Sequence, residues 1–327
     1  MRQFLIALLL VWTAACIAAY FYSHQQNIPV ALAAALLPAF LAEIALYLAP
    51  GFQTMRKHFE RLGSKSIRAG LLTASAGIPY ALAAISLHGF DFPALALLVG
   101  LAGFASFWYV VLKRGPAADF FFLVFMGGVF LSRVFTWIYA RPVADPQLQF
   151  EILGHLMWIR VGIMAVLSIR GLENMRFGFL PARADWKIGV KLFLIFLPLG
   201  AVIAYALNYP HFHLLAVPWW QYAARVVLTF LGMLWVVALS EEFFFRGFLQ
   251  QLLSRELRSE MGGVLTAATM FGLVHLPYRS FPNWRLAILA ATLGIFCGVA
   301  FLRARSVRAS MVTHALAATT FRLFLSP

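Results

Sequence analysis

The sequence predicts an all-α polytopic membrane protein with about eleven transmembrane helices. Of its 327 residues, 62% are hydrophobic and 12% are charged, whereas soluble globular chains carry about 25% charged residues. The apolar residues gather in segments close to the length of about 20 residues that a helix needs to cross a bilayer. These segments lie near residues 4–22, 29–49, 69–88, 93–112, 119–140, 151–170, 187–208, 222–248, 262–278, 286–302 and 308–325.

Basic residues alternate between the connections of these segments. The connections after the second, fourth, sixth, eighth and tenth segments are basic: Arg56, Lys57, Arg61, Lys65 and Arg68; Lys113 and Arg114; Arg170, Arg176, Arg183 and Lys187; Arg255 and Arg258; Arg303, Arg305 and Arg308. The connections 23–28, 88–92 and 208–220 contain no Lys or Arg. Because cytoplasmic loops are enriched in both residues, the pattern predicts a cytoplasmic N-terminus. Arg141, Arg279 and Arg285 are exceptions to it.

The formal charge of +14 follows from these loops. A strongly basic chain can indicate a nucleic-acid partner, but the placement of the charges indicates a lipid bilayer instead. We therefore expect no nucleic-acid partner, and an integral protein of a prokaryotic plasma membrane.

The polar loop 170–187 predicts a domain boundary. It contains Gly, Pro and four basic residues between the sixth and seventh segments. We expect an N-terminal membrane domain of about six helices at 1–170, whose function no motif indicates, and a five-helix domain at 187–327.

Three glutamates lie well inside the predicted spans, and two of them are adjacent. These residues are Glu43, Glu241 and Glu242. Ionisable groups in the membrane are unfavourable by about 2.5–3.5 kcal/mol on insertion scales and usually face a polar cavity. Glu242 and Arg246 are four residues apart, so they meet on one helix face as an ion pair. Glu241 is rotated by roughly 100° from Glu242 and has no such partner.

Two histidines in the C-terminal spans are candidates to act with Glu241. At about 1.5 Å per residue, Glu241 and His275 lie roughly 20 Å from the cytoplasmic ends of their helices, and His314 roughly 9 Å. A carboxylate in an apolar cavity can act as a general base, and a nearby histidine can share the activated water or stabilise developing charge. The alternatives are structural: histidines that hydrogen-bond between helices, and an interfacial pair of glutamate and arginine.

The sequence SEEFFFRG at 240–247 resembles the EExxxR motif of the CPBP or Abi family of intramembrane proteases, which includes CAAX proteases and bacteriocin-processing enzymes. The family's second motif is similar to Phe271 and His275, and its third to His314. The resemblance covers roughly 187–325. It implies a CPBP-like protease core in which Glu241 activates water with help from His275, His314 stabilises the oxyanion, and Glu242 and Arg246 form the motif's structural pair.

The resemblance leaves one donor position and the metal open. Many members have Asn four residues after the last histidine, whereas this chain has Ala318. Losing one oxyanion donor typically weakens transition-state stabilisation by about 2.7–4 kcal/mol. We expect no cofactor, and the alternative is a zinc ion held by Glu241, His275 and His314.

The expected activity is hydrolysis of a peptide bond in a membrane-associated protein or peptide near the cytoplasmic face. The alternative is a non-catalytic scaffold or immunity protein of the same fold, which Ala318 favours. A proton-coupled transporter would favour paired broken helices in related repeats, and the sequence shows no such pairing.

The N-terminal half has polar residues of its own inside its spans. Arg133, His155 and Arg160 lie in the fifth and sixth segments. They indicate either a path for the anionic terminus of a peptide or buried groups that bridge helices, with Glu43 as a possible partner.

Overall fold

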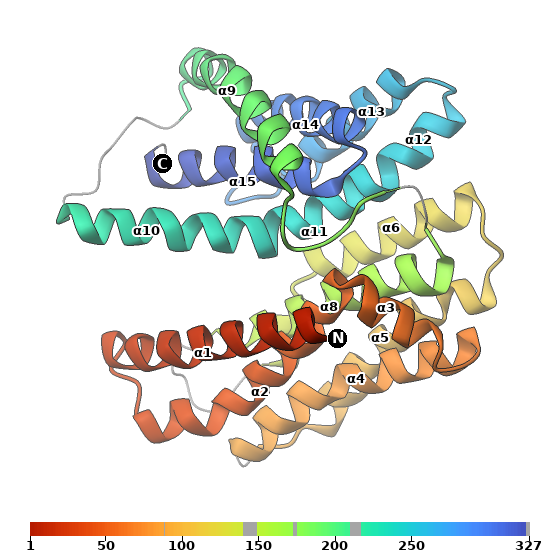
Figure 1. The fold of residues 1–327 in the computed structure, drawn as a ribbon, viewed down its shortest axis with the longest axis vertical. Coiled ribbons are helices and arrows are strands. Elements are labelled where there is room, and N and C mark those ends of the chain that lie inside the picture. The colour runs from red at the N-terminus through yellow and green to blue at the C-terminus, as the bar shows by residue number, and fades with distance from the viewer. Residues whose placement is uncertain (88, 140–148, 173–174, 210–216, 325–327) are drawn as a thin grey trace. The chain divides into compact units, whose positions relative to one another are not determined.

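The computed structural model describes residues 1–87, 89–139, 149–172, 175–209 and 217–324, and these are mainly helical, with no strand among them. The chain divides into two compact units, Met1–Glu173 and Asn174–Pro327 (Figure 1). The all-α prediction is therefore confirmed.

The first unit contains eight α-helices in its described part. They are α1 (Arg2–Gln25), α2 (Val30–Leu48), α3 (Gln53–Glu60), α4 (Lys65–Ser86), α5 (Phe92–Val111), α6 (Pro116–Leu131), α7 (Val134–Ile138) and α8 (Glu151–Met164). A π-helical segment, Ala165–Arg170, continues α8.

The second unit is built around one long helix. Its helices are α9 (Arg183–Ala206), α10 (Trp219–Gly232), α11 (Leu239–Glu242), α12 (Gln251–Glu256), α13 (Glu260–Leu273), α14 (Trp284–Ala304) and α15 (Val307–Phe324). The π-helical segments Met233–Ala238 and Phe243–Gln250 join α10, α11 and α12. The continuous helix Trp219–Glu256 has 38 residues, more than the predicted segment 222–248.

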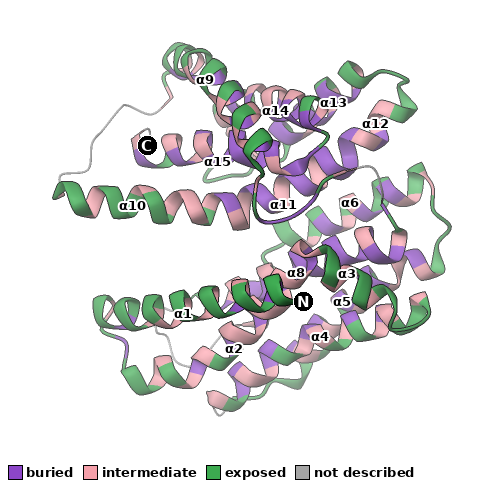
Figure 2. Ribbon diagram, viewed as in Figure 1, coloured by how far each residue is buried: buried purple, intermediate pink, exposed green. Residues whose placement is uncertain are grey.

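Eight helices in the described part of the chain are long and apolar enough to cross a membrane. They are Arg2–Gln25, Val30–Gly51, Lys65–Ser86, Phe92–Val111, Glu151–Arg170, Arg183–Ala206, Trp219–Glu256 and Trp284–Ala304. Large apolar side chains such as Leu10, Val111 and Tyr205 are exposed on them, and Figure 2 shows α1 and α10 mostly exposed or intermediate. This surface suits a bilayer, so the polytopic membrane fold is confirmed.

The other three predicted segments contain helices that differ from the expected spans. The fifth is broken, because Arg133 has a left-handed backbone (φ 55°) between α6 and α7. The ninth ends as a helix at Leu273, since Pro277 disfavours a helical residue before it. The eleventh, α15, is less apolar because it contains several polar residues. Its polar side chains, including Ser310 and Thr313, are buried among other helices.

In the first unit, a buried ion pair joins α2 and α8. Arg160 Nε donates to Glu43 Oε1 at 2.7 Å, and Arg160 Nη2 donates to the backbone oxygen of Ser75 at 2.9 Å. The side chains of Arg160 and Glu43 are 2% and 0% exposed. Because every nitrogen of the guanidinium has a partner, the interpretation as a helix-bridging group with Glu43 as its partner is confirmed.

In the second unit, small residues let the helices approach closely. A Cβ atom at Gly272 would lie 2.5 Å from the oxygen of Ala287, and one at Gly189 would lie 2.6 Å from Val312 Cβ. These contacts bring α13 against α14 and α9 against α15. The absence of a side chain at both glycines therefore allows the close packing of the helices that carry the site.

The topology remains a prediction from the charge pattern. Single cysteines near residues 61, 114, 176 and 256 should react with a membrane-impermeant reagent only from the cytoplasm, and those near 26, 90 and 214 only from outside. Residue 214 lies outside the described residues. Labelling of positions 26 and 61 from the same side would contradict the eleven-span model.

Candidate functional site

The adjacent glutamates lie on a short α-helical turn between two π-helical segments. α11 holds both Glu241 and Glu242, with the wide turns before and after it. π-helical turns are rare and occur frequently at functional sites. The Glu242 side chain is completely buried, whereas the Glu241 side chain is 32% exposed. The two carboxylates therefore have different environments, although they are neighbours in the sequence.

Glu242 is held by two partners. Its Oε1 atom accepts a hydrogen bond from Arg246 Nη1 at 2.9 Å and lies 2.7 Å from His314 Nδ1. The Arg246 side chain is 1% exposed, and its Nη2 donates to the backbone oxygen of Gly294 at 3.2 Å. The predicted pair of Glu242 and Arg246 is present on one continuous helix, and His314 connects it to α15.

Glu241 faces the other nitrogen of the same histidine. Glu241 Oε2 lies 3.7 Å from His314 Nε2, which is longer than a direct hydrogen bond. That oxygen is buried and has no hydrogen-bond partner in the described part of the chain. Because a carboxylate only accepts, His314 donates through Nδ1 to Glu242. Its Nε2 atom therefore remains available to a group bound beside Glu241.

His275 lies just beyond the end of α13 and not inside a span as predicted. Its Nδ1 atom is 2.7 Å from the backbone oxygen of Phe271, so Nδ1 carries the proton and Nε2 is free in the neutral ring. His275 is half-buried. Within the described residues it makes no hydrogen bond or ion pair with Glu241. The structure therefore brings Glu241 and His314 together directly, but not Glu241 and His275.

Phe271 connects the remaining side chains of the site. Its ring packs edgewise against His275 and His314, with centroid distances of 4.7 Å and 5.7 Å. The guanidinium of Arg246 lies 4.3 Å from the same centroid, a favourable cation–π distance. One aromatic side chain thus sets the spacing of both histidines and the arginine.

Cys297 adjoins the site, although no motif in the sequence includes it. Its thiol lies 3.9 Å from the backbone oxygen of Ser310, whose hydroxyl donates to the backbone oxygen of Cys297 at 2.9 Å. Potential ligand atoms of Cys297, Glu242 and His314 lie within 4.8 Å of one another. This closeness depends on the packing of α14 against α15, which spacing along the chain does not reveal.

These three residues fit a divalent metal poorly in this arrangement. The Glu242 oxygen and the His314 nitrogen already bond to each other, and Arg246 holds a positive charge at 2.9 Å from that oxygen. A metal ion would have to displace the guanidinium. Glu241, His275 and His314, the ligands of the predicted zinc alternative, do not form such a group within the described residues.

Ala318 lies one helical turn after His314 on α15 and is partly exposed. Its methyl group cannot donate a hydrogen bond. The neighbouring Thr319 has a buried hydroxyl without a hydrogen-bond partner among the described residues. The position of the family's Asn is therefore occupied by a group without polar atoms.

Comparison with known proteins finds one family to which this part of the chain is similar. Residues 223–320 match the family model described as Type II CAAX prenyl endopeptidase Rce1-like. The match includes the two glutamates, Arg246 and both histidines of the site. No curated protein and no solved structure matches the chain.

Proposed function

Residues 223–320 form a domain of the Rce1-like type II CAAX prenyl endopeptidase family, and on this basis we propose that the protein is an intramembrane endopeptidase in which Glu241 activates water. Its substrate is a membrane-associated protein or peptide, cleaved near the cytoplasmic face of a prokaryotic plasma membrane. The proposal rests above all on the different placement of Glu241 and Glu242.

Glu242 is unsuited to act as the base, because Arg246 and His314 both bind its Oε1 atom. Oε2 of Glu242 also lacks a hydrogen-bond partner among the described residues, but the Glu242 side chain is completely buried and its carboxylate is bonded to a cation, whereas the Glu241 side chain is 32% exposed and its Oε2 atom has no bonded cation. A water molecule about 2.8 Å from both Glu241 Oε2 and His314 Nε2 is compatible with their separation of 3.7 Å. Glu241 would take a proton from this water as the oxygen attacks the scissile carbonyl, and would then pass the proton to the leaving amine.

The histidines take the remaining roles. The bond from His314 Nδ1 to Glu242 fixes the ring. In the imidazolium form the ring also carries a proton on Nε2, and that proton can be donated to the oxyanion of the tetrahedral intermediate. His275 is oriented by its bond to the Phe271 carbonyl, and the resemblance to the family implies that it assists in activating the water. The experiment is to reconstitute the purified protein in liposomes with membrane-anchored peptides and to identify products by mass spectrometry.

Chelation should leave this hydrolysis essentially unchanged. The proposed mechanism uses the carboxylate of Glu241 and needs no metal. Treatment with a chelator followed by desalting should therefore reduce the rate by less than about twofold. Loss of a general base, by comparison, typically reduces a rate by about 10²–10⁴-fold. The control is the same protein with zinc restored. A loss of activity that zinc reverses would instead support zinc held by Glu241, His275 and His314.

Ala318 supports one alternative, a non-catalytic scaffold or immunity protein with this fold. If the protein is a peptidase, Ala318→Asn should leave the rate unchanged or raise it, because it adds a donor one turn from His314. Ala318→Val is the matched control, since it enlarges the side chain without adding a donor, and it should not raise the rate. A wild-type protein without hydrolysis, combined with unchanged biological function for Glu241→Gln, would favour the scaffold.

A further inference from the structure

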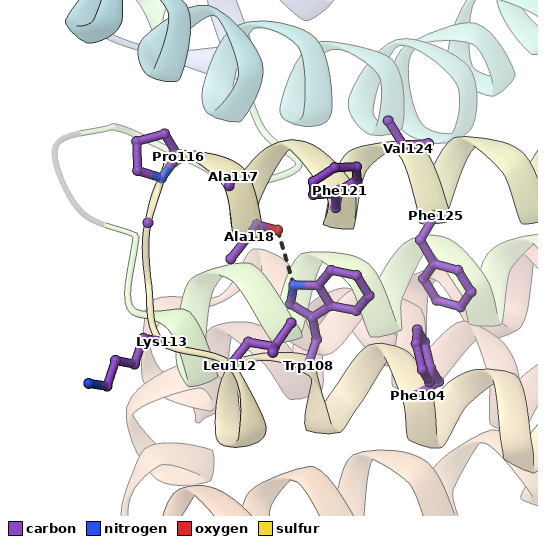
Figure 3. A pocket seen from close by; sticks show the side chains of 11 residues that line it. Phe104, Trp108, Leu112, Lys113, Pro116, Ala117, Ala118, Phe121, Val124 and Phe125 are labelled. Atoms are coloured by element: carbon purple, nitrogen blue, oxygen red, sulfur yellow. Dashed lines mark hydrogen bonds between the residues drawn. The ribbon is translucent and has the colours of Figure 1, made fainter.

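An apolar groove lies between α5 and α6 in the first unit (Figure 3). Its volume is about 670 Å³, within the range of ligand sites. Trp108 stacks on Phe125 with a centroid distance of 6.0 Å, and Phe104 packs edgewise on Phe125 at 4.7 Å. Trp108 Nε1 donates to the oxygen of Ala118 at 3.0 Å. The polar atom of the indole is thus satisfied, and the rings form a wall suited to an apolar ligand.

The groove opens away from the core of the unit. Phe104 and Phe121, on opposite sides of it, are 57% and 59% exposed. In a protein that crosses a membrane, side chains on such a surface face lipid. An acyl chain is therefore the apolar ligand that can reach this groove without leaving the bilayer.

Among the described residues that line the groove, Lys113 is the one with a charged side chain. Arg114 follows it, and both side chains are exposed. The charges of Arg114 and Arg68 are close enough to act on Lys65, at the start of α4. This end of the first unit therefore gathers four cationic side chains, on the side that the charge pattern predicts to be cytoplasmic.

Asp119, an acidic residue near the groove, does not neutralise Lys113 and Arg114. It is 2% exposed and accepts from Arg170 Nε at 2.7 Å and from the hydroxyl of Tyr109 at 3.0 Å. Since its carboxylate is already paired, Lys113, which lines the groove, and the exposed Arg114 that follows it can bind an external anion. Phosphate groups are good partners for such Lys and Arg side chains.

We propose that this groove binds one acyl chain of an anionic phospholipid, with the headgroup phosphate at Lys113 and Arg114. The apolar rings can bury the acyl chain, and the cations can bind the negatively charged headgroups of lipids in the cytoplasmic leaflet. A zwitterionic lipid would fill the groove but would gain less from the cations. This site is separate from the glutamates and histidines of the second unit and does not depend on their function.

The test uses the purified full-length protein and native mass spectrometry with phosphatidylglycerol or phosphatidylcholine of identical acyl chains. The dissociation constant should be roughly 30-fold lower for phosphatidylglycerol. Lys113→Gln combined with Arg114→Gln should raise that constant by roughly 30-fold, the equivalent of about 1 kcal/mol for each charge, and leave phosphatidylcholine binding unchanged. Arg303→Gln, which removes an exposed cation of the second unit, should change neither.

A second variant tests the groove itself. Ala117 lines the groove and is exposed. Ala117→Trp should therefore fill the groove and raise the dissociation constant of the tightest-bound lipid molecule, for phosphatidylglycerol and for phosphatidylcholine. Equal affinity of the wild-type protein for the two lipids would overturn the proposal, as would a preference that survives loss of both cations. A dimer abolished by Ala117→Trp, with phosphatidylglycerol binding intact, would assign the groove to a second copy of the chain and also overturn it.

Discussion

Replacing Arg246 with alanine should lower the free energy of unfolding by about 3–5 kcal/mol, because it leaves the carboxylate of Glu242 buried without its cation. The substitution also removes the bond to the Gly294 oxygen and the contact with the ring of Phe271. The expected result is a large fall in the amount of folded protein in the membrane and in its unfolding temperature in detergent.

Arg225 provides the matched control for this experiment. It lies on the same continuous helix, is exposed, and has no hydrogen bond or ion pair with any residue that the structure describes. Arg225→Ala should therefore leave the unfolding temperature unchanged or raise it. Equal unfolding temperatures for the Arg246→Ala and wild-type proteins would contradict the structural role assigned to the ion pair.

Replacing Glu241 with glutamine should reduce peptide hydrolysis by about 10²–10⁴-fold, the contribution typical of a general base. The amide has nearly the same volume as the carboxylate and removes a charge without an ion pair closer than 3.7 Å, so the folded protein should remain at the wild-type level. The measurement is the rate of product formation per folded molecule in proteoliposomes. His275→Ala and His314→Ala should abolish processing as well.

The same assay separates a catalytic from a structural role for Glu241. If Glu241→Gln lowered the amount of folded protein as much as Arg246→Ala does, Glu241 would belong to the structural network. Glu242→Gln is the companion variant, since it removes the charge that Arg246 and His314 share. It should lower the unfolding temperature, whereas Glu241→Gln should not.

The sequence predicts those parts of the site that depend on local spacing. Four residues separate Glu242 from Arg246, so helical geometry alone places them together. The same geometry turns Glu241 away and identifies it as the unpaired carboxylate. The helical segments themselves follow from apolar length, because a bilayer requires about 20 residues for each span.

Contacts between residues that are far apart in the sequence cannot be predicted from local spacing. His314 is 72 residues from Glu242, and only the packing of α15 against the long helix shows that they bond. The π-helical segments beside α11 and the left-handed break at Arg133 depend on local backbone choices that periodicity does not reveal. Apolar neighbours predict His275 inside a span, but the helix ends at Leu273.

Comparison of protein termini in cell membranes tests most directly whether Glu241 hydrolyses peptide bonds in membrane-associated proteins. Cells would express the wild-type protein, the Glu241→Gln variant at the same level, or neither, and new termini would be identified by mass spectrometry. We expect a set of cleaved termini with the wild-type protein that is missing from both other samples. The same set of termini in the Glu241→Gln sample would contradict the role of Glu241 as the base.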